Sequence, residues 1–391
     1  MKMDANEKNK VKEIVLPHSQ AKLDLYEKYL LNFLTVLGLT PFVNKINLYD
    51  IYCGIGVYKD GNIGSPLITN RSIKAVNEII KQRGKPLKPI SININDIESH
   101  KIQNVQRILD SDKIENCTYE YYNTDADKML QIASARINSY SSKERTLVFI
   151  DPYGYSQIHS DKIYSLIKNE HTEIILFLPV MQMYRFKDIA LNDPNRACYE
   201  DLRNFIFSFF PSNHRIINDK IDNVFEFINE IKGALSYNNR FYTCSHYIER
   251  GKGNYYALFF ITSNIYGLEK MVDAKWKLDP VKGKGFSQKK TATLFDSQFE
   301  QVDHSREIDF LKSQVLNGLR QKILSNVEVY ELTLRNEFKQ THTKTVLYEL
   351  MKMKKVVFCK ENGEYLANSG AYYLDYTYFK SKDKKVYFKI I

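Results

Sequence analysis

The chain has 391 residues, of which 43% are hydrophobic and 26% are charged, a composition typical of a globular protein with a buried core. Its formal net charge of +10 is compatible with a polyanionic partner. No apolar run approaches the ~20 residues that span a bilayer, and the polar N-terminus holds no hydrophobic signal core. We therefore expect a cytoplasmic protein that does not enter the membrane.

The five cysteines are widely spaced and form no CxxC pair, and the eight histidines form no HExxH motif. A disulfide framework needs cysteines in pairs, and zinc sites need closely spaced ligands. The sequence therefore predicts neither a disulfide framework nor a metal site.

The first half of the chain alternates helical and strand patterns. Residues 18–38 carry leucines and aromatic residues at helical spacing and predict an amphipathic helix after a polar tail. Apolar strand-length runs and helical segments then alternate, which favours a parallel sheet with helices on both faces. The expected strands are 46–52, 90–96, 117–122, 146–151 and 173–178, and the expected helices are 68–82, 99–110, 125–138 and 158–168.

A mainly helical stretch, from about 183 to 233, separates these strands from two more, 241–248 and 255–262. The last two flank the turn ERGKGN and predict an antiparallel hairpin, which a helix over 266–278 follows. A parallel α/β sheet that ends in such a hairpin resembles the Rossmann-like sheet of class I methyltransferases.

The C-terminal part differs in kind. Residues 291–305 have the composition of a linker, and three helices are expected after it, followed by two short strands that would form a β-wing. This order is typical of a winged-helix module. The helices are expected at 306–325, 328–338 and 342–353, and the strands at 355–359 and 363–367.

These patterns divide the chain into three parts: an N-terminal tail and helix (1–40), a Rossmann-like domain (41–290) and a winged-helix-like domain (306–391). The excess positive charge lies in the last third, where segment 275–290 holds six lysines against one aspartate. Two interpretations stay open from the sequence alone: a solvated lysine surface, or a surface that binds nucleic acid. Trp276 would accordingly stack on a base or be buried in its helix.

A glycine turn, 50-DIYCGIG, follows the first strand of the sheet. Open α/β sheets bind their ligands at the carboxyl ends of their strands, and glycines there adopt positive φ and let the backbone approach a ligand closely. An acid followed by G-x-G, without GxGxxG or GKS/T, suits S-adenosylmethionine better than NAD or ATP. We expect Asp50, Tyr52, Gly54 and Gly56 to contact this cofactor, with Cys53 as a packing residue.

Acidic residues follow the next two strands as well. Asp96 ends the second strand, where a carboxylate would accept hydrogen bonds from ribose hydroxyls, and Glu98 is the nearby alternative. Asp125 follows the third strand and could face the adenine ring. The alternative interpretation is an ordinary tight turn with acids on the surface.

The fourth strand ends in Asp-Pro-Tyr-Gly, residues 151–154. Exocyclic base amines are weak nucleophiles, and their methylation calls for a hydrogen-bond acceptor aimed at the N–H protons. Asp151 and the Pro152 carbonyl could supply one, while Tyr153 could stack on an extruded base. Adenine-N6 methyltransferases use a related D-P-P-Y, and the D-P-F-G of tRNA guanine-N2 dimethyltransferases is closer. An Asp-Pro turn with no catalytic role is the alternative.

Four segments together are similar to the three-Cys-motif partner (TcmP) family and keep the order of that family across residues 18–290. The segments are His18 with Lys22, 50-DIYCGIGVYKDGNIGSPL, 149-FIDPYG and 254-NYYALFFITSNIYGLEKMVDAKWKLDP. The resemblance implies a Rossmann-like methyltransferase fold and a phage-related genomic neighbourhood with a three-cysteine, radical-SAM-like protein as partner. The chain departs from the family pattern at Tyr52, Cys53 and Ile55, where Phe, Ala and Pro are commoner.

Two hypotheses follow. The first is an S-adenosylmethionine-dependent methyltransferase that acts on an exocyclic base amine in DNA or RNA. The second is a non-catalytic subunit that binds nucleic acid and presents it to a partner enzyme. The sequence leaves open the base, the choice between DNA and RNA, and the oligomeric state.

Overall fold

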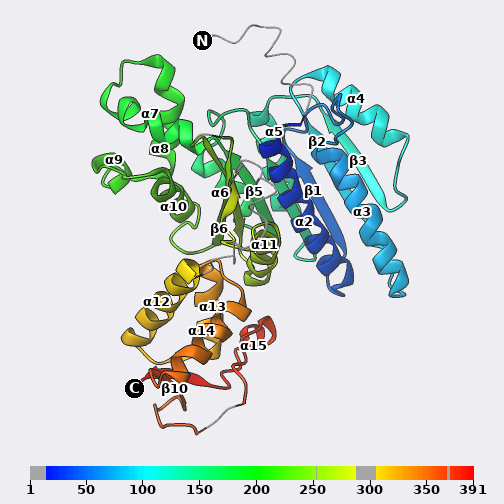
Figure 1. The fold of residues 1–391 in the computed structure, drawn as a ribbon. Helices are drawn as coiled ribbons and strands as arrows, with labels where there is room; N and C mark the ends of the chain where they lie inside the picture. Colours follow the sequence, from blue (N-terminus) through cyan, green and yellow to red (C-terminus); the bar gives the residue numbers. More distant parts are fainter. Residues whose placement is uncertain (1–14, 252, 288–304, 368–369) are drawn as a thin grey trace, which may run out of the picture. The chain divides into compact units, whose positions relative to one another are not determined.

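The computed structural model describes residues 15–251, 253–287, 305–367 and 370–391 (Figure 1). Contacts in space between Cα atoms divide the chain into two compact units. The first is Met1–Asn264 with Gly285–Gln288, and the second is Ile265–Lys284 with Lys289–Ile391. In this division residues 265–284, which the sequence placed in the Rossmann-like domain, group with the C-terminal helices. The linker expected at 291–305 falls almost wholly outside the described residues.

The first unit is built on an eight-stranded sheet with the order β3-β2-β1-β4-β5-β7-β6-β8. Strands β1 to β5 run parallel, and β7 lies antiparallel between β5 and β6. The strands are β1 Lys45–Asp50, β2 Ile90–Asn95, β3 Cys117–Tyr122, β4 Glu144–Ile150, β5 Thr172–Leu178, β6 Tyr242–Glu249, β7 Tyr255–Thr262 and β8 Gly285–Ser287. Apart from β8, this is the Rossmann-like methyltransferase sheet that the sequence predicted, parallel with an antiparallel hairpin, so the fold class predicted for this unit is confirmed.

Helices cover both faces of this sheet. The helices of the parallel part begin and end within about two residues of their predicted bounds. The one larger difference is the helix predicted to begin at 68, which begins at Ser65. These helices are α2 Pro17–Leu39, α3 Ser65–Gln82, α4 Ser99–Asp110, α5 Ala126–Ser139 and α6 Ser160–Ile167. The stretch predicted as mainly helical comprises α7 Val180–Asn192, the 3-10 helix Ala197–Tyr199, α8 Glu200–Phe209, α9 Arg215–Asn218 and α10 Val224–Ala234.

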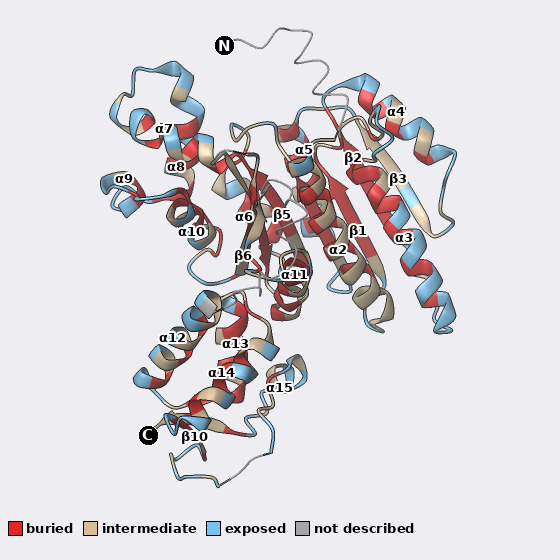
Figure 2. Ribbon diagram, viewed as in Figure 1, coloured by how far each residue is buried: buried red, intermediate tan, exposed pale blue. Residues whose placement is uncertain are grey.

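Successive side chains of β4 point to opposite faces of the sheet, and their contacts show which helices cover each face. Phe149 stacks on Tyr26 of α2, with ring centroids 4.4 Å apart, and α2 lies beside α3 in Figure 1. Val148 and Ile150 point the other way, into a core cluster shared with α5, α6 and α10. Figure 2 shows the central strands buried along their length, as a parallel sheet between two helical layers requires.

The second unit contains helices and a small antiparallel sheet of order β10-β11-β9. Its helices are α11 Ile265–Leu278, α12 Ser305–Gln321, α13 Asn326–Arg335, α14 Gln340–Lys352 and α15 Tyr376–Ser381. Its strands are β9 Leu324–Ser325, β10 Val356–Cys359 and β11 Tyr387–Ile390. These parts agree with a winged-helix module in kind, and that assignment stays a prediction.

Two expectations for the second unit are wrong in detail. The strand expected at 363–367 contributes only an isolated bridge between Tyr365 and Cys359, and β10 pairs instead with β11 at the C-terminal end. The helix expected to run to residue 325 ends at Gln321. Ser325 lies in β9 and its side chain caps α13 in a capping box with Glu328, which stops the preceding helix.

The basic segment 275–290 is only partly available to a partner. Lys275 has 0% exposure and forms an ion pair with Glu337 of the same unit. Trp276 is buried, and its indole N–H donates to the Glu337 carbonyl at 2.8 Å. The buried alternative for Trp276 is therefore confirmed, and Lys275 cannot contact a phosphate in this arrangement.

Among the described residues, no helix has the length and apolar character needed to cross a membrane. The same residues hold no group of three or more His, Cys, Asp or Glu arranged to bind a metal ion.

Candidate functional site

The candidate site lies at the carboxyl edge of the parallel strands, where the loops after β1, β2 and β4 meet. An open pocket there has an empty volume of about 630 Å³, part of which is open solvent. Four residues singled out from the sequence line it: Tyr52, Asp96, Pro152 and Tyr153. The remaining lining residues are Asn95, Ile97, Ala126, Gly154, Ser156 and Gln157. Three loops far apart in the sequence thus converge as predicted from the strand order.

The glycine turn after β1 needs both of its glycines, for different reasons. Gly54 has φ +66°, and a Cβ added there would meet no atom within 4 Å, so open space lies over its backbone. Gly56 has φ +82°, and its added Cβ would come within 2.9 Å of the Val105 side chain of α4. Gly54 therefore leaves room for a ligand, whereas Gly56 lets the turn pack against α4.

Asp50, the last residue of β1, is a buried carboxylate with 5% exposure. Neither of its oxygens accepts a hydrogen bond of ordinary geometry from the described residues. Burial raises the pKa of Asp50 to about 7; the nearby Ser65 hydroxyl and Tyr52 N–H counteract this shift, and the charges of Asp151 and Asp96 add to it. A cationic ligand group would supply the missing partner.

Asp96 holds the loops together from the end of β2. Its carboxylate accepts from the Gly54 N–H at 3.1 Å and from the Glu98 N–H at 3.0 Å, and it is 3% exposed. Lys101 lies 3.7 Å from the same carboxylate and 2.5 Å from Glu98. Since each carboxylate oxygen can accept more than one hydrogen bond, Asp96 keeps capacity for a ligand hydroxyl while it fixes the glycine turn.

Asp125 does not line the pocket, and neither do Asp50, Gly54, Gly56 and Asp151, which lie in the same strand ends and loops. The Asp125 side chain accepts from the Lys128 N–H at 2.9 Å and so caps the N-terminus of α5. The next residue, Ala126, reaches the pocket instead. Asp125 thus stabilises the start of α5, and its expected contact with adenine stays a prediction.

Asp151 forms an ion pair with Lys22 of α2 at the end of β4. The two side chains are 21% and 12% exposed, so the pair is only partly screened by water. The neighbouring Tyr153 is 79% exposed, and its hydroxyl accepts from Lys101 at 2.9 Å. The sequence singled out Asp151, Lys22 and Tyr153, but it did not indicate that Lys22 and Lys101 each pair with one end of the DPYG motif.

Sequence reasoning missed Tyr58, which follows the glycine turn. Burial raises the pKa of Tyr58 to about 12, and the charges of Asp151 and Asp50 act on it in the same direction. Tyr58 therefore lies within electrostatic range of the acids that end β1 and β4. A single tyrosine in a loop carries no spacing signal, and only the folded loop reveals its place.

Two further expectations concern the same loops. Burial raises the pKa of the Cys53 thiol, which makes it a packing residue, as expected, and no thiolate nucleophile. Tyr52 donates its hydroxyl to Gln157 at 2.7 Å, which links the glycine turn to the loop after β4. Tyr52 thus forms a wall of the pocket.

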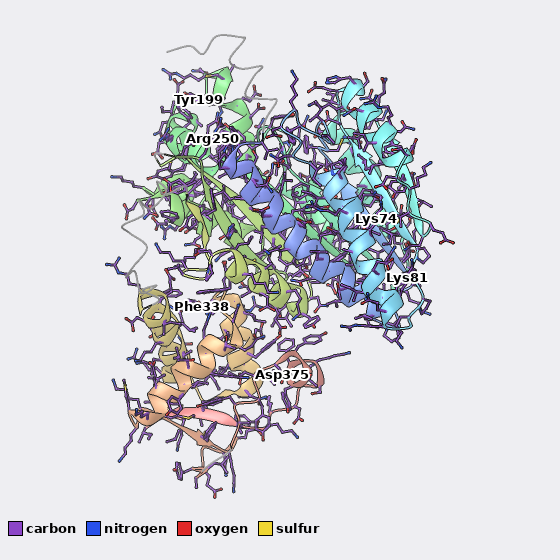
Figure 3. The ribbon with its side chains drawn as sticks, turned by 45° about the vertical axis from the view of Figure 1, so that its right-hand side comes forward. Lys74, Lys81, Tyr199, Arg250, Phe338 and Asp375 are labelled. Carbon is purple, nitrogen blue, oxygen red and sulfur yellow. The ribbon has the colours of Figure 1, made fainter. Side chains whose placement is uncertain are left out.

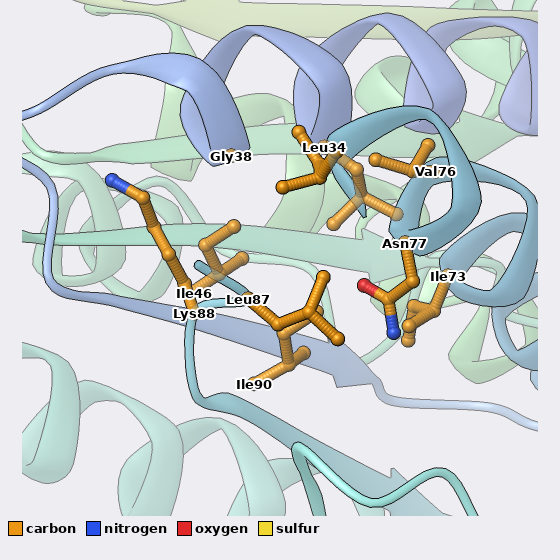
Figure 4. A pocket seen from close by; sticks show the side chains of 10 residues that line it. Leu34, Gly38, Ile46, Ile73, Val76, Asn77, Leu87, Lys88 and Ile90 are labelled. Carbon is orange, nitrogen blue, oxygen red and sulfur yellow. The ribbon is translucent and has the colours of Figure 1, made fainter. Parts of the chain in front are cut away.

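A second hollow lies at the opposite, amino end of β1 and β2 (Figure 4). Its lining is mostly aliphatic, with Leu34 of α2, Ile73 of α3 and Ile90 of β2 among the residues shown. None of the predicted site residues lies there, and its composition is that of a packing defect in the core.

No protein-family model matches the chain, and no curated protein matches it. Solved structures of similar fold include magnesium protoporphyrin IX methyltransferase from Synechocystis PCC 6803 with bound SAH (10% identity, 66% of this chain and 95% of that chain, TM-score 0.31). A dimethyladenosine transferase from Plasmodium falciparum (11%, 82% and 95%, TM-score 0.28) and loganic acid methyltransferase with SAH (9%, 68% and 85%, TM-score 0.29) are also similar. At these scores the similarities transfer neither a substrate nor a residue's role to this chain.

Proposed function

We propose that this protein is an S-adenosylmethionine-dependent methyltransferase that acts on an exocyclic amine of a base in DNA or RNA. The observation that supports it most is Asp50, a buried carboxylate without a bonded partner, placed at the end of β1 beside open backbone at Gly54. The ammonium group of the cofactor's methionine part would pair with Asp50. Charge complementarity of this kind compensates for the cost of burying the carboxylate.

The residues around the pocket fit the rest of this cofactor. Gly54 would let the ligand approach the backbone, Asp96 would accept from the ribose hydroxyls, and Ile97 with Ala126 would offer an apolar wall to the adenine ring. The cofactor would supply an electrophilic methyl group on its sulfonium sulfur. The chain would contribute orientation and exclusion of water, which account for much of the rate in such transfers.

Asp151 and the Pro152 carbonyl would orient the amine that receives the methyl group. On receiving the methyl group the amine would lose a proton, which the Asp151 carboxylate would accept. The Asp151 carboxylate would accept the N–H hydrogen bond that directs the nitrogen lone pair toward the methyl group. Lys22, which forms an ion pair with this carboxylate, would hold it in place.

The second unit would bind the phosphate backbone. Three residues on one face of α14 are exposed and spaced four apart: Lys344, Tyr348 and Lys352. Lysines with an exposed tyrosine suit binding to nucleic acid through phosphate contacts and stacking. A three-Cys-motif, radical-SAM-like partner in a phage-related setting belongs to the same proposal, on the strength of the sequence resemblance.

One observation favours a second candidate, a non-catalytic subunit that binds nucleic acid. The ion pair with Lys22 gives Asp151 a structural partner, so this carboxylate can be explained without a substrate. In that case the chain would keep the fold and present nucleic acid to a partner enzyme.

The test is transfer of labelled methyl groups from S-adenosylmethionine to heat-denatured genomic DNA and to total tRNA. Asp112→Ala is the matched control for Asp151→Ala, because Asp112 also pairs with a lysine, Lys74, away from the site. We expect the wild type and Asp112→Ala to label one of the substrates, and Asp151→Ala to lose about a hundredfold or more in rate. Equal labelling by both variants would show that Asp151 does not orient the amine. No labelling by a folded wild type that binds oligonucleotides would favour the non-catalytic subunit.

A further inference from the structure

We infer that the acceptor base stacks on a surface formed by the rings of His18, Tyr256 and Phe177, beside Asp151, and we call this surface the ring shelf. The inference deepens the proposed function and rests on it, since it says where the methyl acceptor lies. The ligand class is a planar nitrogen base that carries a phosphate.

The ring shelf is a continuous stack within the first unit. The rings of Phe177, at the end of β5, and Tyr256, near the start of β7, are parallel within 3° with centroids 5.3 Å apart. The His18 ring, in the first turn of α2, lies 6.0 Å from Tyr256 with an angle of 13° between the planes. Phe177 is buried, whereas His18 and Tyr256 are half-buried. Because Tyr256 already stacks with both other rings, a base would stack on the parts of His18 and Tyr256 that stay exposed.

Lys22 joins the ring shelf to the acceptor carboxylate. Its ammonium group lies 4.9 Å from the centroid of the Phe177 ring and forms the ion pair with Asp151. Lys22 is therefore a positioning residue: it fixes Asp151 next to the shelf. A base on the shelf would then lie on the same side of Lys22's contacts as the group that accepts its N–H.

Two features of the ring shelf suit a base that carries a phosphate. Arg250 is exposed in the turn after β6 and donates to the Tyr256 hydroxyl at 3.3 Å, which leaves a guanidinium beside the rings for a phosphate (Figure 3). Burial, with the charges of Arg250 and Lys22, lowers the pKa of His18 to about 4. His18 is thus neutral at pH 7 and stacks without adding charge.

The ring shelf is separate from the cofactor pocket. None of His18, Tyr256 and Phe177 lines that pocket. Pro152 lines it, whereas the neighbouring Asp151 pairs with Lys22, whose ammonium group lies over the Phe177 ring. A methyl donor in the pocket and an acceptor on the shelf would therefore approach each other at the end of β4. This is the arrangement that a direct transfer needs.

The test measures binding of AMP, GMP and CMP by saturation-transfer NMR, with the cofactor pocket filled by saturating S-adenosylhomocysteine. Tyr256→Leu removes a shelf ring, and Tyr199→Leu is its matched control, because Tyr199 is a half-buried tyrosine stacked on Phe186 at 5.4 Å (Figure 3). We expect at least one nucleotide to bind the wild type and Tyr199→Leu, and Tyr256→Leu to bind it about fivefold more weakly or worse.

Further variants separate the parts of the shelf. Arg250→Gln should weaken binding of the nucleotide but not of the corresponding nucleoside. Lys22→Met should slow methyl transfer at an unchanged affinity for S-adenosylhomocysteine, whereas Lys74→Met, which also breaks a Lys–Asp pair, should not. Thermal unfolding of each variant identifies those that have lost the fold.

The outcomes distinguish the inference from the proposed function. No nucleotide binding by the wild type, or equal binding by Tyr256→Leu, would overturn the ring shelf, even if S-adenosylhomocysteine binds. Nucleotide binding that depends on Tyr256 in a protein that does not bind S-adenosylhomocysteine would support the shelf and overturn the proposed function.

Discussion

At the residue scale, Asp50 links cofactor binding to pH. Because burial raises its pKa to about 7, Asp50 changes its ionisation in the neutral pH range in the ligand-free protein. An ammonium group pairs with the ionised form, so binding of S-adenosylmethionine below pH 7 must release a proton. We expect the affinity to fall by up to about tenfold per pH unit below pH 7 and to level off above it, as measured by calorimetry.

The control for this prediction is another buried carboxylate. Burial also raises the pKa of Glu173 to about 7, but Tyr29 and Thr262 donate hydrogen bonds to it at the start of β5, far from the pocket. Asp50→Asn should weaken binding at pH 8 and flatten its pH dependence, and Glu173→Gln should change neither. An affinity that does not vary with pH in the wild type would show that Asp50 is not the partner of the ammonium group.

The same carboxylate affects the stability of the protein without ligand. Because the pKa of Asp50 is higher in the folded state, its contribution to stability is fully present below about pH 4 and is lost as the pH rises through 7. Asn does not titrate, so Asp50→Asn should unfold at a higher urea concentration than the wild type at pH 8. The gain is at most about 4 kcal/mol. A variant that is less stable than the wild type at pH 8 would contradict a buried, unpaired Asp50.

At the element scale, the N-terminus of α5 distinguishes two roles for Asp125. Because Asp125 is the N-cap of α5, Asp125→Ala should lower the free energy of unfolding by about 1 kcal/mol. Asparagine also caps helices, so Asp125→Asn should lower it much less. Affinity for S-adenosylmethionine should change by less than about threefold in both variants, because the Asp125 side chain is already bonded to the Lys128 N–H. A large loss of affinity in both, with little change in stability, would support the contact with adenine that the sequence suggested.

The elements of the first unit could be predicted closely because hydrophobic periodicity and turn residues agree there. Helix 99–110 and strands 117–122 and 255–262 have the observed bounds. The strand at 363–367 could not be predicted correctly, because β10 pairs with β11 at the C-terminal end of the chain instead. Pairing between strands distant in sequence leaves no signal in a local residue pattern. Strand β8 begins with Gly285 and is three residues long, which is too short to show an alternation of apolar and polar residues.

The site could be predicted in part for a similar reason. The carboxyl edge of a parallel sheet gathers whatever follows each strand, so Tyr52, Asp96 and Pro152 meet in one pocket. The partners of these residues could not be predicted, because Lys22 reaches Asp151 across 129 positions of sequence. Tyr58 was missed for the same reason, since only tertiary structure brings it within electrostatic range of the acids.

At the scale of the whole molecule, binding of nucleic acid and binding of cofactor should be separable. Lys344 and Lys352 lie on α14 in the second unit, whereas the pocket is in the first. Replacing both lysines by Gln should weaken binding of a single-stranded oligonucleotide and reduce the slope of log affinity against log salt by roughly 0.7 per lysine. The affinity for S-adenosylmethionine should not change.

The matched control is the pair Lys74→Gln and Lys81→Gln, which removes the same charge from α3 of the first unit (Figure 3). It should leave the salt slope as in the wild type. Equal slopes for both double variants would mean that net charge alone, and not the face of α14, attracts nucleic acid.

The measurement that tests the central claim most directly is calorimetric titration of S-adenosylmethionine into the wild type, Gly54→Ala and Gly84→Ala. The two glycines have φ of +66° and +64° and open space around an added Cβ, so both variants carry the same backbone strain, but Gly84 follows α3 away from the pocket. We predict micromolar binding by the wild type and Gly84→Ala, and a loss of about tenfold or more in Gly54→Ala. No binding by the folded wild type, or an equal loss in both variants, would contradict a cofactor site at the end of β1.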